Sequence, residues 1–368
     1  MRNEYVVAND LFAFDYFKCL RSEYAKNACS LCIELCPEEA MVFDRARLTL
    51  DTQKCTGCAA CMGICPTEAL ASRSFDAESF VLEFAEGADP NLSCKENVPC
   101  LAALSPEHYV SIALRREGAT ACDLSHCAEC GVNREGRVYE TITAMLDEAD
   151  RFLAAMGADE RIGREPIHYE APETAEEGGG PDPARRALFQ KLAGAASGEE
   201  GPKTDLSELA VDEEERQPLK RLLLKNAMKK RADAFGEETT RQAAFSFAVG
   251  KRIDAMACNN CQECAMFCPT GALSVLKDNT GIVFQSGKCI ACGICNDICQ
   301  PRAMHDDDTF DPVDFAFDRM ALLVKHDLQM CEECKVAFPY KGGEKICDRC
   351  RDFRDSYSDL FTLAKDLE

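Results

Sequence analysis

The sequence predicts an α+β fold built from several small units. Two observations lead to this prediction. Cysteines recur three residues apart in tight runs in both halves of the chain, and the residues between the runs show apolar spacings typical of short strands and helices. The chain has 368 residues, which allows two or three domains, and 25 cysteines. Because cysteine-bound metal can replace hydrophobic burial as a source of folding energy, we expect small metal-stapled units rather than one large core.

The cysteine runs share one spacing. Three of them have the form C-x2-C-x2-C-x3-C, and one is looser. In each run the last cysteine opens a recurring phrase, such as Cys65-Pro-Thr-Glu-Ala-Leu. The runs are Cys55-Cys58-Cys61-Cys65, Cys258-Cys261-Cys264-Cys268, Cys289-Cys292-Cys295-Cys299 and the looser Cys29-Cys32-Cys36. This spacing lets three thiolates hold one iron–sulfur cube while the fourth reaches across to another cube, so the sequence predicts an electron carrier.

Composition argues against several other classes of protein. The close cysteine spacing and the lack of a signal peptide favour metal clusters over disulfides and indicate a reducing cytoplasm. No run of about 18 apolar residues occurs, so we expect no membrane insertion. The formal charge of −22 argues against nucleic-acid binding, which needs a basic face. It suits docking on a basic patch of a redox partner, or simply solubility.

The segment 251–310 is predicted to form one module with two cubes. Because the fourth cysteine of each run crosses over, we expect one cube at Cys258, Cys261, Cys264 and Cys299, and the other at Cys268, Cys289, Cys292 and Cys295. Over about 50 residues this pattern resembles the bacterial-type ferredoxins with two [4Fe–4S] clusters. One departure is Gln300, which stands where proline normally follows the fourth cysteine.

The segment 17–75 is expected to be a second ferredoxin-type module, with small strands at the apolar residues 41–43 and 48–50. One cube is expected at Cys36, Cys55, Cys58 and Cys61. For the other cube, the cysteines in place are Cys29, Cys32 and Cys65. Lys26 holds the remaining position, and we predict Cys19 as the ligand because the nine-residue loop back to the cluster closes at little cost. A labile three-cysteine cluster or a [3Fe–4S] cluster, with Cys19 free, is the alternative.

The segment 78–160 is predicted to be a small α/β unit. Residues 80–84 and 119–124 are expected strands. Ser105-Pro106-Glu107 supplies an N-cap, a first-turn proline and an early acid for a helix. Apolar residues at helical spacing from Val138 to Met156 predict a second, longer helix that ends at Gly157.

Five cysteines flank these elements. Cys94 and Cys100 precede the capped helix, whereas Cys122, Cys127 and Cys130 follow the second strand, so strand ends would bring the pairs to one sheet edge. The order of Cys100, helix, strand and Cys127-x-x-Cys130 resembles the delta iron–sulfur subunit of methyl-viologen-reducing hydrogenases. That resemblance implies a [2Fe–2S] cluster on Cys94, Cys100, Cys127 and Cys130, with Cys122 buried, and docking beside a larger redox enzyme. A [4Fe–4S] cluster, a redox-active dithiol and unligated buried thiols are the alternatives.

The segment 161–250 is predicted to be an acidic linker followed by two or three helices with charged faces. One helix is expected to open near Pro218. The basic run 225–231 within it is expected to be a solvated helix face.

The last cysteines lie in the segment 326–352, which we expect to be a zinc-ribbon-like unit. They form two C-x2-C pairs twelve residues apart, namely Cys331, Cys334, Cys347 and Cys350. Four thiolates suit one tetrahedral ion, and a rubredoxin-like iron is the alternative to zinc. Lys335 and Arg351 stand where rubredoxin knuckles usually carry glycine, which favours zinc.

The sequence contains neither a glycine-rich nucleotide loop nor an evident acid–base constellation. We therefore expect an electron-transfer subunit rather than a stand-alone enzyme. The expected partner is a larger cytoplasmic oxidoreductase, such as a formate dehydrogenase, a hydrogenase or a heterodisulfide-reductase-type complex. The alternatives are an assembly factor whose zinc ribbon grips a client enzyme, and a thiol–disulfide or sulfur-reducing enzyme that uses the middle cysteines.

Overall fold

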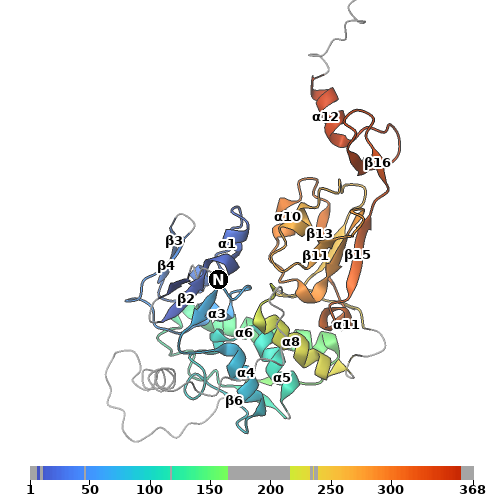
Figure 1. Cartoon of the computed structure of the whole chain (residues 1–368). Coiled ribbons are helices and arrows are strands. Elements are labelled where there is room, and N and C mark those ends of the chain that lie inside the picture. Colours follow the sequence, from blue (N-terminus) through green and yellow to red (C-terminus); the bar gives the residue numbers. More distant parts are fainter. Residues whose placement is uncertain are drawn as a thin grey trace, which may run out of the picture.

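The computed structural model describes residues 6–8, 11–44, 47–116, 118–164, 216–232, 235 and 239–357. Figure 1 shows two modules side by side, the N-terminal one in blue and the C-terminal one in orange. Helices from the middle of the chain lie beneath both modules in this view, and the C-terminal unit projects away from the C-terminal module. Among the described residues, no helix is both long and apolar enough to cross a bilayer.

The N-terminal module consists of short strands and single-turn helices. One antiparallel sheet has the order β1-β2-β5, and β3 pairs with β4 in a hairpin, which confirms the strands expected at 41–43 and 48–50. The strands are β1 (Val6–Ala8), β2 (Phe12–Asp15), β3 (Met41–Asp44), β4 (Arg47–Leu50) and β5 (Leu70–Ser72). The helices are η1 (Tyr16–Lys18), α1 (Leu20–Glu23), α2 (Leu31–Glu34) and α3 (Ala60–Gly63).

The middle unit is an α/β layer, as the sequence predicts. Its parallel strands β6 (Asn91–Leu92), β7 (Thr120–Cys122) and β8 (Ile162–Gly163) form one sheet in that order. Its helices are α4 (Ala77–Glu86), η2 (Leu101–Ala103), α5 (Pro106–Arg115), η3 (Arg134–Gly136) and α6 (Arg137–Met156). The helix α5 begins after Ser105, whose hydroxyl accepts the N–H of His108, and α6 ends at Gly157 with φ of 86°. The N-cap predicted at Ser105 and the helix end predicted at Gly157 are therefore confirmed.

The strand expected at residues 80–84 is wrong, because these residues belong to the helix α4. The Asp76 carboxylate caps this helix by accepting the N–H of Ser79. Ala77, Val81 and Phe84 are buried at helical spacing. A short apolar run does not separate strand from helix by itself, and the cap decides the outcome here.

The helix expected near Pro218 is present as α8 (Leu219–Lys230), but its surroundings differ from the prediction. Lys220, Arg221 and Lys225 are buried, so the basic run from residue 225 is a solvated face only at its end, where Lys229 and Lys230 are exposed. The expected acidic linker lies outside the described residues.

The C-terminal module again combines small antiparallel sheets with short helices. Its sheets pair β10 with β13, β9 with β14, and β11 with β12 and β15. The strands are β9 (Arg241–Gln242), β10 (Gly250–Ile253), β11 (Leu273–Val275), β12 (Gly281–Gln285), β13 (Met304–Asp307), β14 (Thr309–Phe310) and β15 (Met320–Lys325). The helices are α9 (Glu263–Met266), η6 (Ser286–Lys288), α10 (Ile294–Ile298) and α11 (Pro312–Ala316). The chain then ends in the hairpin β16 (Leu328–Met330) and β17 (Ala337–Pro339) and the helix α12 (Asp348–Tyr357).

The core differs from the expected set of small separate units. One large apolar cluster runs from Phe12 through the middle unit to Ala316. At its centre the Phe152 ring of α6 lies 5.0 Å from the rings of Phe245, which precedes β10, and Phe310, which belongs to β14. The middle unit therefore supplies a hydrophobic core on which both cysteine-rich modules pack.

Candidate metal centres

Four groups of cysteines gather in the two cysteine-rich modules. Site II is Cys36, Cys55, Cys58 and Cys61; site III is Cys19, Cys29, Cys32 and Cys65; site IV is Cys268, Cys289, Cys292 and Cys295; site V is Cys258, Cys261, Cys264 and Cys299. The cysteines of sites II, IV and V each line one cavity, which at site II has a volume of about 200 Å³. In site III, burial raises the pKa of Cys19, Cys29 and Cys32, and the nearby charge of Cys65 raises it further. Each group therefore has the crossed composition expected of paired cubes.

Cys19 occupies the place of a first cysteine in a run. It directly follows the single-turn helix η1 with φ −72° and ψ 129°. Cys289, the first cysteine of its run, follows η6 with φ −74° and ψ 129°. Lys26, which holds the regular sequence position, is exposed. The backbone thus places Cys19, not residue 26, beside the other cysteines of site III.

The recurring phrase after each run has a structural cause. Three residues after the last cysteine the backbone is left-handed, with φ of 47° at Glu39, 53° at Glu68, 67° at Gly271 and 54° at Arg302. In three copies the N–H of the following alanine donates to the cysteine Sγ: Ala40 to Cys36 at 3.3 Å, Ala69 to Cys65 at 3.4 Å and Ala303 to Cys299 at 3.2 Å. Such bonds stabilise thiolate sulfur and tune a bound cluster.

Electrostatics at these sites also favours a bound cation. Burial, followed by the charges of neighbouring thiolates, raises the pKa of Cys32, Cys264 and Cys292 to about 12. Without a cation these thiols would stay protonated near neutral pH. Iron at the site would compensate the clustered negative charge and hold the sulfurs as thiolates.

The middle cysteines form a further group, site I, made of Cys94, Cys100, Cys127 and Cys130. These four side chains line one cavity between η2 and the start of α6. Cys122 lies elsewhere, fully buried in β7 opposite Leu92 of β6, where burial raises its pKa to about 12. The structure thus brings the two cysteine pairs together at one cavity and leaves Cys122 outside its lining, near enough for the charge of Cys127 to act on it.

The C-terminal cysteines form the tightest group. The four sulfurs of Cys331, Cys334, Cys347 and Cys350 all lie within 4.8 Å of one another. The Sγ atoms of Cys334 and Cys347 are 3.7 Å apart, and a tetrahedral ion with metal–sulfur bonds of about 2.3 Å requires a separation of about 3.8 Å. The N–H of Cys347 donates to Cys331 Sγ and lowers the pKa of Cys331 to about 6. This geometry fits one metal ion, and we call it the C-terminal site.

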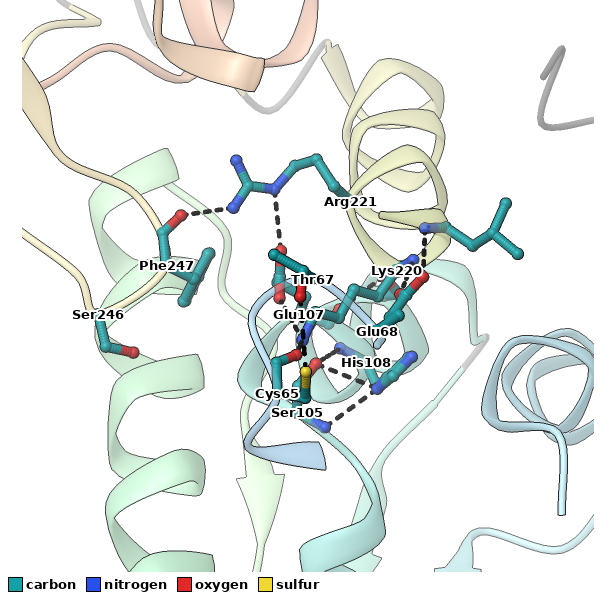
Figure 2. Close-up of polar contacts among 12 residues, drawn as sticks. Cys65, Thr67, Glu68, Ser105, Glu107, His108, Lys220, Arg221, Ser246 and Phe247 are labelled. Atoms are coloured by element: carbon teal, nitrogen blue, oxygen red, sulfur yellow. Dashed lines mark hydrogen bonds and ion pairs between the residues drawn. The ribbon is translucent and has the colours of Figure 1, made fainter. Parts of the chain in front are cut away.

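Sequence analysis missed a buried polar group between the two modules, which Figure 2 shows. Glu107 of α5 pairs with Arg221 of α8, with Nε 2.9 Å from Oε1, and Lys220 Nζ lies 3.6 Å from its other oxygen. The Glu68 carboxylate accepts the backbone N–H groups of Leu219 and Lys220. The only sequence signal is a pair of basic residues inside the apolar run 219–224.

Close contacts connect successive sites. Gly63 of α3, which follows Cys61, lies so near η2 that a Cβ would be 2.2 Å from the carbonyl oxygen of Ala102. This contact brings site II against the segment that follows Cys100 of site I. Between the modules, Leu20 packs with Ile290 and Ile294, and Cys29 and Cys292 border this same apolar cluster. Sites III and IV therefore face each other where the two modules meet.

Comparison with known families identifies both modules. A family described as a 4Fe–4S dicluster domain matches residues 250–300, and a 4Fe–4S binding domain matches residues 48–71. No curated protein and no solved structure matches the chain. The first match covers all eight cysteines of sites IV and V, and the second covers the run that ends at Cys65. The chain therefore contains two ferredoxin-type [4Fe–4S] domains, one before and one after the α/β unit.

Proposed function

We propose that this protein carries four [4Fe–4S] clusters, at sites II to V, and relays electrons to or from a larger oxidoreductase. The observation that carries the proposal is the closeness of paired sites: Cys32 of site III and Cys61 of site II border one apolar cluster, and Cys264 of site V and Cys295 of site IV share another. A [4Fe–4S] cluster supplies a one-electron centre. Formate dehydrogenases, hydrogenases and heterodisulfide-reductase-type complexes are the proposed class of partner, in a reducing cytoplasm.

At the two remaining sites we propose a [2Fe–2S] cluster and a zinc ion. Site I supplies four cysteines around one cavity, which suits a cluster. At the C-terminal site, Lys335 takes the left-handed conformation with φ of 56° directly after the second cysteine. Because rubredoxin knuckles usually place glycine there, this lysine favours a structural zinc.

Metal analysis of the anaerobically purified protein tests the proposal. We expect about 18 iron atoms and one zinc per chain, since four cubes contribute about 16 and site I about two. EPR of the reduced protein should show interacting one-electron centres. About 14 iron atoms would mean that Cys19 is not a ligand and that site III holds no cube, since one cube contributes four. Iron far below that number would overturn the electron-carrier proposal.

Exchange of single middle cysteines for serine tests the assignment of site I. Cys122→Ser is expected to leave the iron content unchanged, because Cys122 lies outside the cavity. Cys127→Ser, its matched counterpart, should lose about two iron atoms per chain, since it removes a ligand. If both variants keep their iron and the native protein shows a reversible two-electron disulfide, site I is a dithiol centre instead.

A further inference from the structure

The buried charges on α8 contact both modules at their junction. The Arg221 side chain is 0% exposed. Its Nη1 donates to the carbonyl oxygens of Gly287, at 3.1 Å, and Cys289, at 2.6 Å. Its Nη2 donates to the carbonyl of Phe247. Arg221 is thus anchored to the backbone of a cysteine in site IV, as well as to Glu107 (Figure 2).

Lys220, the preceding residue, makes the corresponding contact with the other module. Its Nζ donates to the carbonyl oxygen of Cys65 at 2.6 Å, and Cys65 belongs to site III. The Lys220 side chain is 3% exposed, as is that of Glu107. Two cations and the Glu107 carboxylate are therefore enclosed between the backbones of a site III cysteine and a site IV cysteine, and the half-buried Glu68 carboxylate lies beside Lys220 at the start of α8.

Burial makes these charges effective. A charge out of water interacts several times more strongly with its neighbours than an exposed one, and it is little screened by salt. When a cluster takes up one electron and no bond breaks, its charge becomes more negative by one unit. A nearby buried cation favours that reduced state, and a nearby buried carboxylate disfavours it.

We propose that Lys220 and Arg221, counterbalanced by Glu107, are positioning residues that join the two ferredoxin-type domains and set the reduction potentials of sites III and IV. This inference rests on the proposed cluster content of these sites. The arrangement also keeps sites III and IV adjacent. Lys220 donates to a carbonyl of the N-terminal module and Arg221 to carbonyls of the C-terminal module, and the two residues are neighbours in the same helix. The charges buried at this junction thereby both hold the two domains together and influence the clusters beside them.

A charge series tests the proposal in the full-length protein by potentiometric titration with dithionite and redox mediators, followed by EPR. The site IV signal is assigned by its loss in Cys292→Ser. Arg221→Gln is expected to lower the equilibrium constant for reduction of site IV about tenfold, equivalent to about 59 mV for one electron. Glu107→Gln should raise it by a similar factor. The double variant, which restores the net charge, should lie within about threefold of the native protein.

Shifts of opposite sign separate an electrostatic role from a structural one, because damaged packing would move both single variants in the same direction. Lys229→Gln, on the exposed end of α8, is the matched control and should leave the potential unchanged. Shifts of the site IV potential in the same direction in Arg221→Gln and Glu107→Gln would overturn the inference. The proposal of an electron carrier would still stand if the iron content is as expected. If Arg221→Gln loses its iron, the site IV potentials of Glu107→Gln and of the double variant test the inference instead, and they should show the values expected above. A native protein without a site IV signal would instead contradict the proposed function.

Discussion

Removing the proposed zinc ion from the C-terminal site is expected to unfold residues 328–357 and to leave the rest of the fold intact. The buried core of this unit consists of only Cys331, Ile346 and Cys347. Nine of the ten residues of α12 are exposed, and the tenth, Cys350, is half-buried. A structural metal ion can supply on the order of 10 kcal/mol of folding free energy, and nothing else in this unit approaches that amount. Hydrogen exchange measured before and after chelation should show lost protection in β16 and β17.

A point variant separates this effect from general damage by the chelator. Cys334→Ser removes one ligand and should abolish the same protection, with iron at the other sites retained. Cys94→Ser, which alters a different site, should leave β16 and β17 protected. Protection that persists in the metal-free unit would show that the hairpin is stable by itself and that the metal has another role.

Local features of the fold were predictable because they depend on neighbouring residues. The spacing of the cysteine runs sets the geometry of sites II to V, and the repeated alanine marks the N–H···S bond at Cys36, Cys65 and Cys299. The helices α5 and α6 carry their own capping signals at Ser105 and Gly157. Such features are encoded within a few residues and need no knowledge of the rest of the chain.

Features that depend on distant segments were not predictable. Lys225 reads as a surface residue, but Asp318, which lies 93 residues further on, covers it and accepts a hydrogen bond of 2.6 Å. Arg221 is buried because Glu107 and three backbone carbonyls surround it. No pattern among neighbouring residues in the sequence indicates partners that lie so far along the chain. A buried cation is tolerated only where paired, and the pairing exists only in the folded chain.

Replacing Gly63 with alanine is expected to destabilise the contact between sites I and II by about 3 kcal/mol, at the upper end of the usual cost of overpacking. The added Cβ would lie 2.2 Å from the carbonyl oxygen of Ala102 and 2.9 Å from the carbonyl carbon of Ala103. Both are backbone atoms, so no side-chain rotation relieves the clash. Either α3 or η2 must move, which shifts the segments that carry Cys61 and Cys100.

Hydrogen exchange in α3 and η2 measures this effect, and protection there should fall about a hundredfold, since each factor of ten corresponds to about 1.4 kcal/mol. Gly131→Ala is the matched control, because no atom lies within 4 Å of its added Cβ, and its stability should change by less than about 0.5 kcal/mol. Unchanged protection in Gly63→Ala would mean that α3 and η2 can separate freely. Sites I and II would then be neighbours without being mechanically joined, and the close approach at Gly63 would have no part in holding them together.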